Sequence, residues 1–493
     1  MNKYSITAAL FFVFTSVSFS WEKKDSSGFI QPGRRISSSV ILSEDQISYS
    51  YKTFKVRIPD NAFKMEVKID NSQADLDIYM NFDREIENYD NVDYSSTLDL
   101  YNEKFSLNRL SSDPLYTGVY YIDIVYPLDS LPIINNREVS QIPFGVTVKV
   151  TTVGTPEILI PDRAIHSSLS AEDSILKVYA VDVDPGVDAL RIDLFDTKSD
   201  LDMYIRYKSP ALSFVEADFI RESYLGRESL VIDGQSVKPL RPGRYYISVF
   251  DRIEDDFSDD FSLIVSYSEE VPDFLKEYPQ LPQWGNELEE VLYATVEIST
   301  ETGSGSGCIV SEEGYIITGL HVITDTSGEI AEKIYVSMNL SNFYPPRELF
   351  RAELVDKRDA EDLVLLKIVS GFYGQDLIDN YSFPHYTMAL DKPVQMGQPL
   401  SFLGYPQIGS EGSRASISLT RGIVSGFNTM DFGLLIKTDG EINSGNSGGA
   451  AFNQDYELIG FPMSVISDEG GQLAYIHPVS LIPETWLEIL GIK

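Results

Sequence analysis

The chain has 493 residues, and because a single hydrophobic core stops growing at roughly 250–300 residues, we expect several domains. Its 75 acidic residues against 39 basic ones give a net charge of −36, which excludes the basic surface that nucleic-acid binding requires and opposes attraction to anionic membranes. Hydrophobic residues make up 43% of the chain, which excludes wholesale disorder.

The first 20 residues are typical of a secretory signal peptide. Lys3 provides a short positive flank, an apolar stretch covers residues 8–14, and small side chains occupy Ser18 and Ser20. This pattern predicts cleavage after Ser20 and a secreted or periplasmic location. A membrane-spanning helix needs about 18 consecutive apolar residues, and no later run approaches this length, so we expect no membrane insertion. The single cysteine, Cys308, excludes an internal disulfide and lies in an apolar strand pattern.

The first half of the chain contains an internal repeat. The segment from Asp75 to Tyr79 (DLDIY) matches the segment from Asp200 to Tyr204 (DLDMY). At the same offset of 125 residues, GVYYI at Gly118 matches GRYYI at Gly243. A period this long indicates tandem domains. Both copies alternate apolar and polar residues with period two between turn residues, which predicts two antiparallel β-sandwiches over residues 36–152 and 160–268.

These two motifs resemble those of the bacterial pre-peptidase C-terminal domain, which carries an early DLD-x-Y string and a late G-x-YY string. The resemblance implies jelly-roll-like sandwiches attached to a secreted peptidase, and structural calcium in some relatives. The aspartate pairs Asp75/Asp77 and Asp200/Asp202 are the candidate calcium ligands. The alternative is that these carboxylates accept hydrogen bonds from loop backbone, since alternate residues of a strand point to one face.

A proline-bearing linker is expected over residues 269–285, and the pattern then changes. A glycine-rich strand around Gly305 is followed by the string TGLHV around His321, an acid before a buried strand at Asp362 (DLVLLK), and the loop GNSGG around Ser447. These residues occur in the order His, Asp, Ser, which is the chain order of the chymotrypsin-like double β-barrel. We therefore expect a double β-barrel over residues 286–493, and an all-β protein.

The residue types suit nucleophilic catalysis. A serine hydroxyl needs a base with a pKa near neutrality to remove its proton, and imidazole is the natural choice. The strings resemble those of trypsin-like peptidases, closest to the HtrA/Deg branch. The resemblance implies a serine endopeptidase in which His321 is the base, Asp362 orients it and Ser447 attacks the peptide carbonyl.

The same resemblance implies an oxyanion hole formed by the N–H groups of Gly445 and Ser447. Glu441, six residues before Ser447, and His477, in a strand expected to pair with substrate, are candidate specificity residues. Catalysis requires no cofactor, the partners are protein or peptide substrates, and we expect a monomer.

Two departures from the family pattern matter. Leu320 stands before the base where the family usually has alanine, and Asn446 replaces the aspartate that zymogens pair with a new N-terminus. The first departure leaves open an alternative, a surface- or polymer-binding protein with a silent protease-like domain. A second alternative is that the N-terminal half is a pro-region that silences the protease until it is cut.

Overall fold

The structure is a computed structural model that describes residues 28–492 except 43–48, 99–101, 112, 128–132, 135–136, 171–174, 198, 224, 252–257, 279–283, 302, 326, 341–344, 380, 407–415 and 469–470. The signal peptide and its cleavage after Ser20 therefore lie outside the described residues. The chain divides into two compact units, Met1–Thr155 with Ala211–Ala217, and Pro156–Pro210 with Asp218–Lys493.

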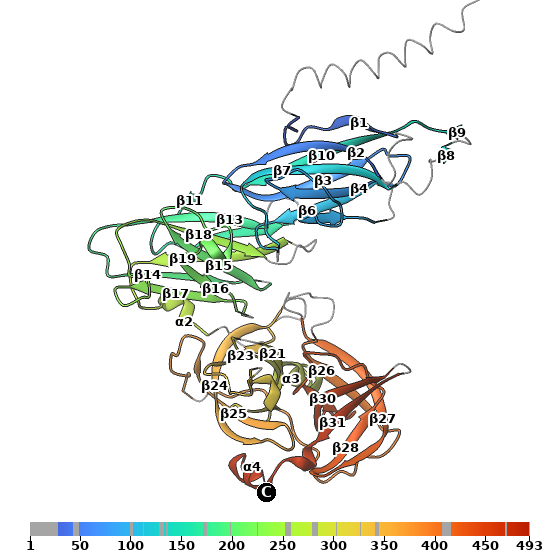
Figure 1. The fold of residues 1–493 in the computed structure, drawn as a ribbon. Helices are drawn as coiled ribbons and strands as arrows, with labels where there is room; N and C mark the ends of the chain where they lie inside the picture. The colour runs from blue at the N-terminus through green and yellow to red at the C-terminus, as the bar shows by residue number, and fades with distance from the viewer. Residues whose placement is uncertain are drawn as a thin grey trace, which may run out of the picture. The chain divides into compact units, whose positions relative to one another are not determined.

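Two antiparallel four-stranded sheets form the first unit (Figure 1). One contains β1 (Ile36–Ile41), β10 (Gln141–Thr152), β3 (Ala62–Asp70) and β6 (Lys104–Asn108). The other contains β2 (Tyr49–Ile58), β7 (Gly118–Pro127), β4 (Asp77–Phe82) and β5 (Tyr94–Ser96). The short strands β8 (Ile133–Ile134) and β9 (Arg137–Glu138) pair separately. Because successive strand residues face opposite sides, Met65, Val67 and Ile69 of β3 enter one core.

The second sandwich has one sheet of five strands and one of four. The first contains β11 (Glu157–Ile158), β13 (Leu176–Val183), β18 (Gly243–Asp251), β15 (Leu201–Tyr207) and β16 (Phe219–Arg221). The second contains β12 (Ile165–Ser170), β19 (Ser258–Ser266), β14 (Ala189–Phe195) and β17 (Glu228–Asp233). The segment Ala211–Ala217, which holds the 3₁₀ turn η1 (Phe214–Glu216), belongs instead to the first unit. There Glu216 forms an ion pair with Arg109 at 3.0 Å. The sequence repeat did not predict that a segment of the second copy would belong to the first unit.

The sequence repeat is matched by repeated hydrogen bonds. Tyr120 Oη accepts from the N–H of Tyr116 at 2.8 Å, and Tyr245 Oη accepts from the N–H of Arg241 at 3.0 Å. This is the geometry of a tyrosine corner, which closes a turn onto its own strand. The same offset relates two further bonds of 2.8 Å, from Phe82 N–H to Asp93 Oδ2 and from Tyr207 N–H to Asp218 Oδ2. The GxYY strings thus serve the architecture of each sandwich.

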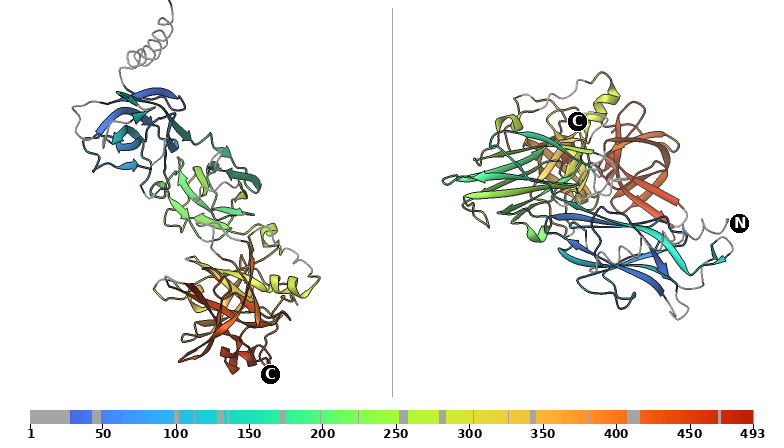
Figure 2. Two further views of the ribbon diagram at one scale, coloured as in Figure 1. Left: turned by 90° about the vertical axis from the view of Figure 1, so that its right-hand side faces the viewer. Right: turned by 90° about the horizontal axis from the view of Figure 1, so that it is seen from above.

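Two closed six-stranded barrels follow, shown in yellow to red in Figures 1 and 2. The first contains β20 (Thr295–Ser299), β21 (Ser304–Ile309), β22 (Tyr315–Gly319), β25 (Leu363–Gly371), β24 (Arg347–Arg358) and β23 (Ile334–Met338). The second contains β26 (Pro399–Gly404), β27 (Ser418–Met430), β28 (Gly433–Thr438), β31 (Gly471–Pro478), β30 (Leu458–Asp468) and β29 (Ala450–Phe452). The predicted all-β fold with a C-terminal double barrel is confirmed.

Short helices flank the barrels. Helix α2 (Asp273–Lys276) lies within the predicted linker, and α3 (Glu287–Ala294) begins at Asn286, whose side chain accepts from the N–H of Glu289. Helix α4 (Glu484–Ile489) follows the 3₁₀ turn η3 (Val479–Leu481). Its Trp486 is fully buried in a cluster that also contains Leu363 of the first barrel and Phe461 of the second. The two barrels therefore share a core.

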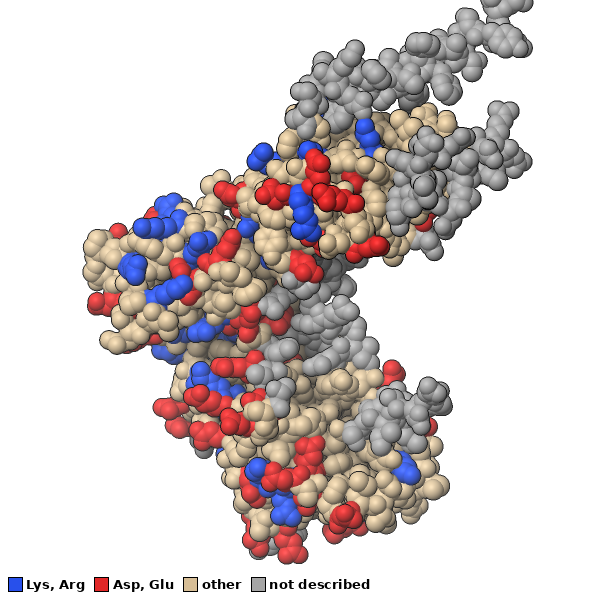
Figure 3. All heavy atoms as spheres, in the orientation of Figure 1, with Lys and Arg blue, Asp and Glu red and all other residues tan. Residues whose placement is uncertain are grey.

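Three further features concern surface charge, helix hydropathy and the single cysteine. On the face drawn in Figure 3, basic and acidic side chains are interspersed. Among the described residues, no helix is long and apolar enough to cross a membrane. Cys308 is fully buried, as its strand pattern predicted, and burial raises the pKa of its thiol well above the usual value.

Candidate active site

The first barrel brings His321 and Asp362 together through strand pairing. Strand β22 ends at Gly319, which lies opposite Leu363, the first residue of the antiparallel strand β25. The residues just beyond this pair therefore meet at one end of the sheet. The 3₁₀ turn η2 (Leu320–Val322) then carries His321 toward Asp362.

Three hydrogen bonds connect the two segments. The Nδ1 atom of His321 lies 2.6 Å from Oδ2 of Asp362, and the His321 N–H donates to Oδ1 of the same carboxylate at 3.0 Å. The N–H of Leu320 donates to the Asp362 carbonyl at 3.2 Å. Because Asp362 is an acceptor, the proton of a neutral imidazole lies on Nδ1, and Nε2 keeps the lone pair that a general base needs.

Two neighbours of His321 show how closely the turn is packed. A Cβ atom on Gly319 would lie 2.9 Å from Cε1 of His321 and 3.2 Å from Sδ of Met463, so a side chain at this position would force the imidazole to shift. Leu320 packs its side chain against the core of the first barrel. The departure from alanine at this position is therefore accommodated by the barrel core.

Ser447 lies in the loop between β28 and β29 of the second barrel, and this loop is held against the first barrel. The Ser306 N–H donates to the Ser447 carbonyl at 2.9 Å, and Ser306 Oγ donates to the Gly445 carbonyl at 2.7 Å. Gly448 has a φ of +79°, and a Cβ there would lie 2.9 Å from the N atom of Gly319. These contacts place the serine loop beside the turn that carries the histidine.

The Ser447 hydroxyl donates to the Met463 carbonyl at 3.5 Å, rather than to the imidazole. Met463 is also the residue whose sulfur flanks Gly319 and His321. A change of the serine χ1 rotamer redirects the hydroxyl, and catalytic hydrogen bonds commonly tighten only when substrate is bound.

The backbone N–H groups around Ser447 differ in their hydrogen bonding. Gly445 has a φ of +91°, which favours glycine. Within the described part of the chain, the N–H groups of Gly445 and Ser447 donate to no protein acceptor. The neighbouring N–H of Asn446 is used by the Asn443 carbonyl at 3.0 Å, and the Asn446 residue is buried. The two unused donors flank the serine.

The candidate specificity residues lie in different surroundings. Glu441 is exposed, and its carbonyl accepts from Oγ1 of Thr420 at 2.9 Å, so its carboxylate is not enclosed by a pocket. His477 is buried, and its Nδ1 lies 2.7 Å from the carbonyl oxygen of Glu361. Its strand β31, which was expected to pair with substrate, is hydrogen-bonded to β28 on one side and to β30 on the other within the closed barrel.

The four aspartates named as candidate calcium ligands lie where the repeat predicted. Asp77 begins β4 and Asp202 lies in β15, and both residues are buried, whereas Asp75 and Asp200 are half-buried. In the described portion of the chain, no three His, Cys, Asp or Glu side chains are grouped so that they could hold a metal ion. Because calcium also takes backbone carbonyl and water oxygens, calcium binding at these aspartates stays a prediction.

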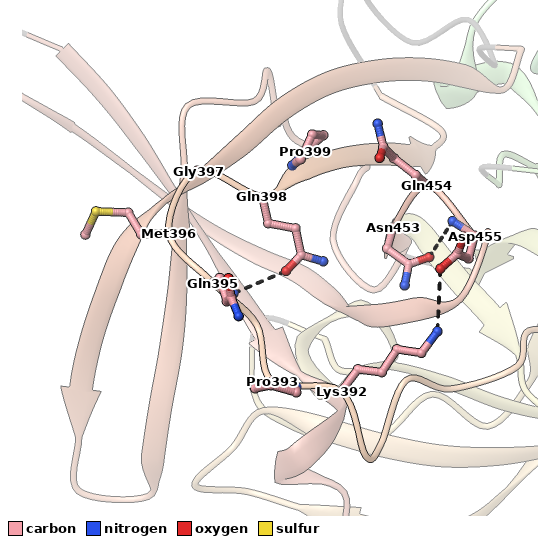
Figure 4. A pocket seen from close by; sticks show the side chains of 10 residues that line it. All are labelled: Lys392, Pro393, Gln395, Met396, Gly397, Gln398, Pro399, Asn453, Gln454 and Asp455. Carbon is pink, nitrogen blue, oxygen red and sulfur yellow. Dashed lines mark hydrogen bonds and ion pairs between the residues drawn. The ribbon is translucent and has the colours of Figure 1, made fainter.

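A separate hollow opens at the second barrel (Figure 4), lined by residues 392–393, 395–399 and 453–455. The Lys392 amine points toward Asp455 at 3.5 Å and also pairs with Glu457 at 2.5 Å. These ion pairs join the segment before β26 to the turn after β29. None of His321, Asp362 or Ser447 lines this hollow.

Sequence reasoning missed two residues that shape the site, Ser306 and Met463, which contact Ser447. No motif marked them, because each acts through backbone groups far away in the sequence. His477 was predicted as a specificity residue, but its hydrogen-bond partner, the residue before Asp362, was not predicted.

Comparison with known proteins agrees with this geometry. Residues 305–461 match the trypsin-like peptidase domain family. A probable periplasmic serine endoprotease DegP-like of Halomonas elongata is 34% identical over 183 residues, covering 36% of this chain and 33% of that protein. A protein of the same description from Rhizobium meliloti is 32% identical over 180 residues, covering 36% and 31%. The chain thus spans about a third of the length of these relatives.

Among solved structures, the serine endoprotease from Yersinia pestis shares 27% identity and covers 44% of this chain and 68% of that one. Its TM-score of 0.32 is too low to compare the two folds. The matched range 305–461 contains His321, Asp362 and Ser447. This part of the chain is therefore similar to the trypsin-like peptidase domain, and these three residues lie within the matched range.

Proposed function

We propose that this protein is an exported serine endopeptidase in which His321, Asp362 and Ser447 form the catalytic triad. The observation that carries the proposal is the double hydrogen bond from His321 to Asp362, through Nδ1 and through the backbone N–H, next to the serine loop. The similarity of residues 305–461 to trypsin-like peptidase domains supports it.

In the proposed reaction, Nε2 of His321 removes the proton of Ser447 Oγ as that oxygen attacks the peptide carbonyl. The N–H groups of Gly445 and Ser447 bind the oxyanion, and Asp362 stabilises the imidazolium. His321 then gives the proton to the leaving amine, which breaks the C–N bond and leaves an acyl-serine. Water, deprotonated by His321, hydrolyses this ester and releases the carboxylate product.

The substrates in this proposal are proteins or peptides, the enzyme is a monomer, and catalysis needs no cofactor. The proposed location is the periplasm or the outside of the cell, since the relatives from Halomonas elongata and Rhizobium meliloti are described as periplasmic. Mass spectrometry of the exported protein tests the leader: we expect Trp21 as the first residue. A mature chain that still begins with Met1 would contradict cleavage after Ser20.

Casein hydrolysis and labelling by a fluorophosphonate probe test the enzyme. We expect both in the mature protein, and a loss of roughly 10⁶-fold in rate in Ser447→Ala. The matched control is Ser444→Ala, an exposed serine three residues away, which should keep both. If the wild type is neither labelled nor active, the alternative of a binding protein with a silent barrel is favoured. Labelling that appears only after proteolysis before residue 286 would favour the pro-region alternative.

A further inference from the structure

His477 connects the second barrel to the triad of the first. It lies opposite Phe461 near the end of β31, and the residue is only 6% exposed. Its Nδ1 is 2.7 Å from the carbonyl oxygen of Glu361, a residue 116 positions earlier in the chain. A carbonyl oxygen only accepts hydrogen bonds, so Nδ1 carries the proton.

The accepting carbonyl belongs to the peptide plane that precedes Asp362. Asp362 has a φ of +50°, a left-handed conformation that is uncommon outside glycine, although aspartate adopts it more readily than most residues. The φ torsion of Asp362 describes rotation between this peptide plane and its Cα. A donor that fixes the Glu361 carbonyl therefore restricts φ of Asp362, and with it the direction of the carboxylate.

The other end of the same residue is held by the turn of the base. The Asp362 carbonyl accepts from Leu320 N–H, and its carboxylate accepts from His321. The preceding peptide plane is held from outside this turn, because His477 of the second barrel donates to the Glu361 carbonyl.

The charged groups around His477 are few. Glu361, Asp362 and His321 act on it electrostatically, and Glu361 also pairs with Arg358 at 3.2 Å. On the side of the second barrel, the ring of Phe432 lies 5.8 Å from the imidazole. Burial is the largest influence and lowers the pKa of His477, so the neutral imidazole is favoured in the folded protein.

We propose that His477, as the neutral Nδ1–H tautomer, is a positioning residue that holds the peptide plane before Asp362 and so directs the carboxylate toward His321. This inference rests on the proposed function, because it assigns His477 a role in that triad. His477 would act through Asp362 and would not touch the substrate.

The first test observes the histidines directly. The chain has only four, namely His166, His321, His385 and His477, so an ¹⁵N-histidine NMR spectrum is simple to assign. We expect His477 to be the Nδ1–H tautomer with a titration midpoint below the ordinary histidine pKa. We also expect a downfield Nδ1–H resonance from His321 against Asp362. An Nε2–H tautomer at His477 would overturn the proposal, whether or not the protein is active and whether or not any variant folds.

The second test uses His477→Phe, which removes the donor, and His477→Asn, whose amide reaches nearly the Nδ1 position. We expect kcat for a casein-derived peptide to fall roughly 10- to 100-fold in the phenylalanine variant with little change in KM. The asparagine variant should recover most of this loss. In the phenylalanine variant, the acid limb of the kcat/KM profile should move to lower pH, because a misdirected Asp362 carboxylate stabilises the His321 imidazolium less.

His385→Phe is the matched control, because His385 also points Nδ1 toward a backbone carbonyl, that of Phe383 at 3.2 Å, and has no contact with the triad. It should leave rate, pH profile and the His321 resonance unchanged. A His477→Phe variant with wild-type kcat and an unshifted His321 resonance would refute the positioning role while leaving the peptidase proposal intact. A wild-type protein without activity would refute the peptidase proposal alone, because the NMR spectrum measures the His477 tautomer independently of activity.

Discussion

The sandwiches and the barrels are both pairs of β-domains, but they use their motifs in opposite ways. In each sandwich the repeated tyrosine accepts a hydrogen bond within its own copy, Tyr120 from the N–H of Tyr116 and Tyr245 from the N–H of Arg241. In the barrels, His321 and Asp362 pair within the first barrel, whereas the serine loop of the second barrel contacts the first, as Ser447 does through Ser306. A motif that closes on itself maintains a fold, whereas one that crosses an interface builds a site that neither barrel holds alone.

The largest effect should come from the site that the barrels share. Asp362→Asn keeps the shape of the side chain but favours the wrong histidine tautomer, so we expect kcat to fall roughly 10⁴-fold. The midpoint of thermal unfolding should hardly change, and peptide hydrolysis and calorimetry measure the two properties. The control is Asp359→Asn, which removes the same charge from an exposed residue paired with Lys357. Comparable losses in both variants would show that charge alone, not geometry, is responsible.

Next comes the helix that closes the shared core. Trp486 is fully buried, and its Nε1 donates to Oδ2 of Asp356 in β24 at 2.7 Å, a bond that is also the main cause of the lowered pKa of that carboxyl. Trp486→Ala should lower the free energy of unfolding by about 3–5 kcal/mol. Denaturant unfolding measures this free energy. The control is Trp284→Ala, because Trp284 is 39% exposed. Equal losses would contradict the shared core.

The second sandwich contains a buried carboxyl, Glu228. Burial is the main cause that raises the pKa of Glu228 to about 7. Between about pH 4.5 and pH 7, the folded state keeps a proton on Glu228 that the unfolded state has lost. The free energy of unfolding therefore falls progressively as the pH rises through this range. Glu228→Gln should remove that loss, a gain of about 2–3 kcal/mol at pH 8 and little at pH 4.

The corresponding carboxyl of the first sandwich, Glu103, lies 125 residues earlier and also has a raised pKa through burial. Glu103→Gln should therefore act with the same sign. Urea unfolding at pH 4, 6 and 8 compares the two variants with Glu270→Gln at an exposed site. A pH-independent gain in either variant would exclude the protonation mechanism.

The smallest effect belongs to the tyrosine corners. Tyr120→Phe and Tyr245→Phe each remove one acceptor for a turn N–H and should cost about 1 kcal/mol of stability. Casein hydrolysis should be unchanged, because these bonds stay within the sandwiches. The control is Tyr51→Phe, at a residue 49% exposed. Lost hydrolysis in a corner variant with intact barrels would show that the sandwiches act on the site.

The sequence predicted much of this protein because the relevant signals are local. Period-two alternation predicted the strands, and the offset of 125 residues between the two copies of the DLD and GxYY strings predicted the second sandwich. The order of His321, Asp362 and Ser447 predicted the double barrel. Pairing of β22 with β25 then brings the histidine and aspartate together, a consequence of antiparallel register that the strand pattern already contained.

Only the tertiary structure decided what surrounds these residues. It left Glu441 exposed, buried His477 against Glu361, and assigned Ala211–Ala217 to the first unit. Each of these outcomes depends on backbone groups or surfaces contributed by segments far apart in the chain. A carbonyl oxygen is the same in every residue, so no residue type marks which one His477 will meet; the packing of two closed barrels determines it.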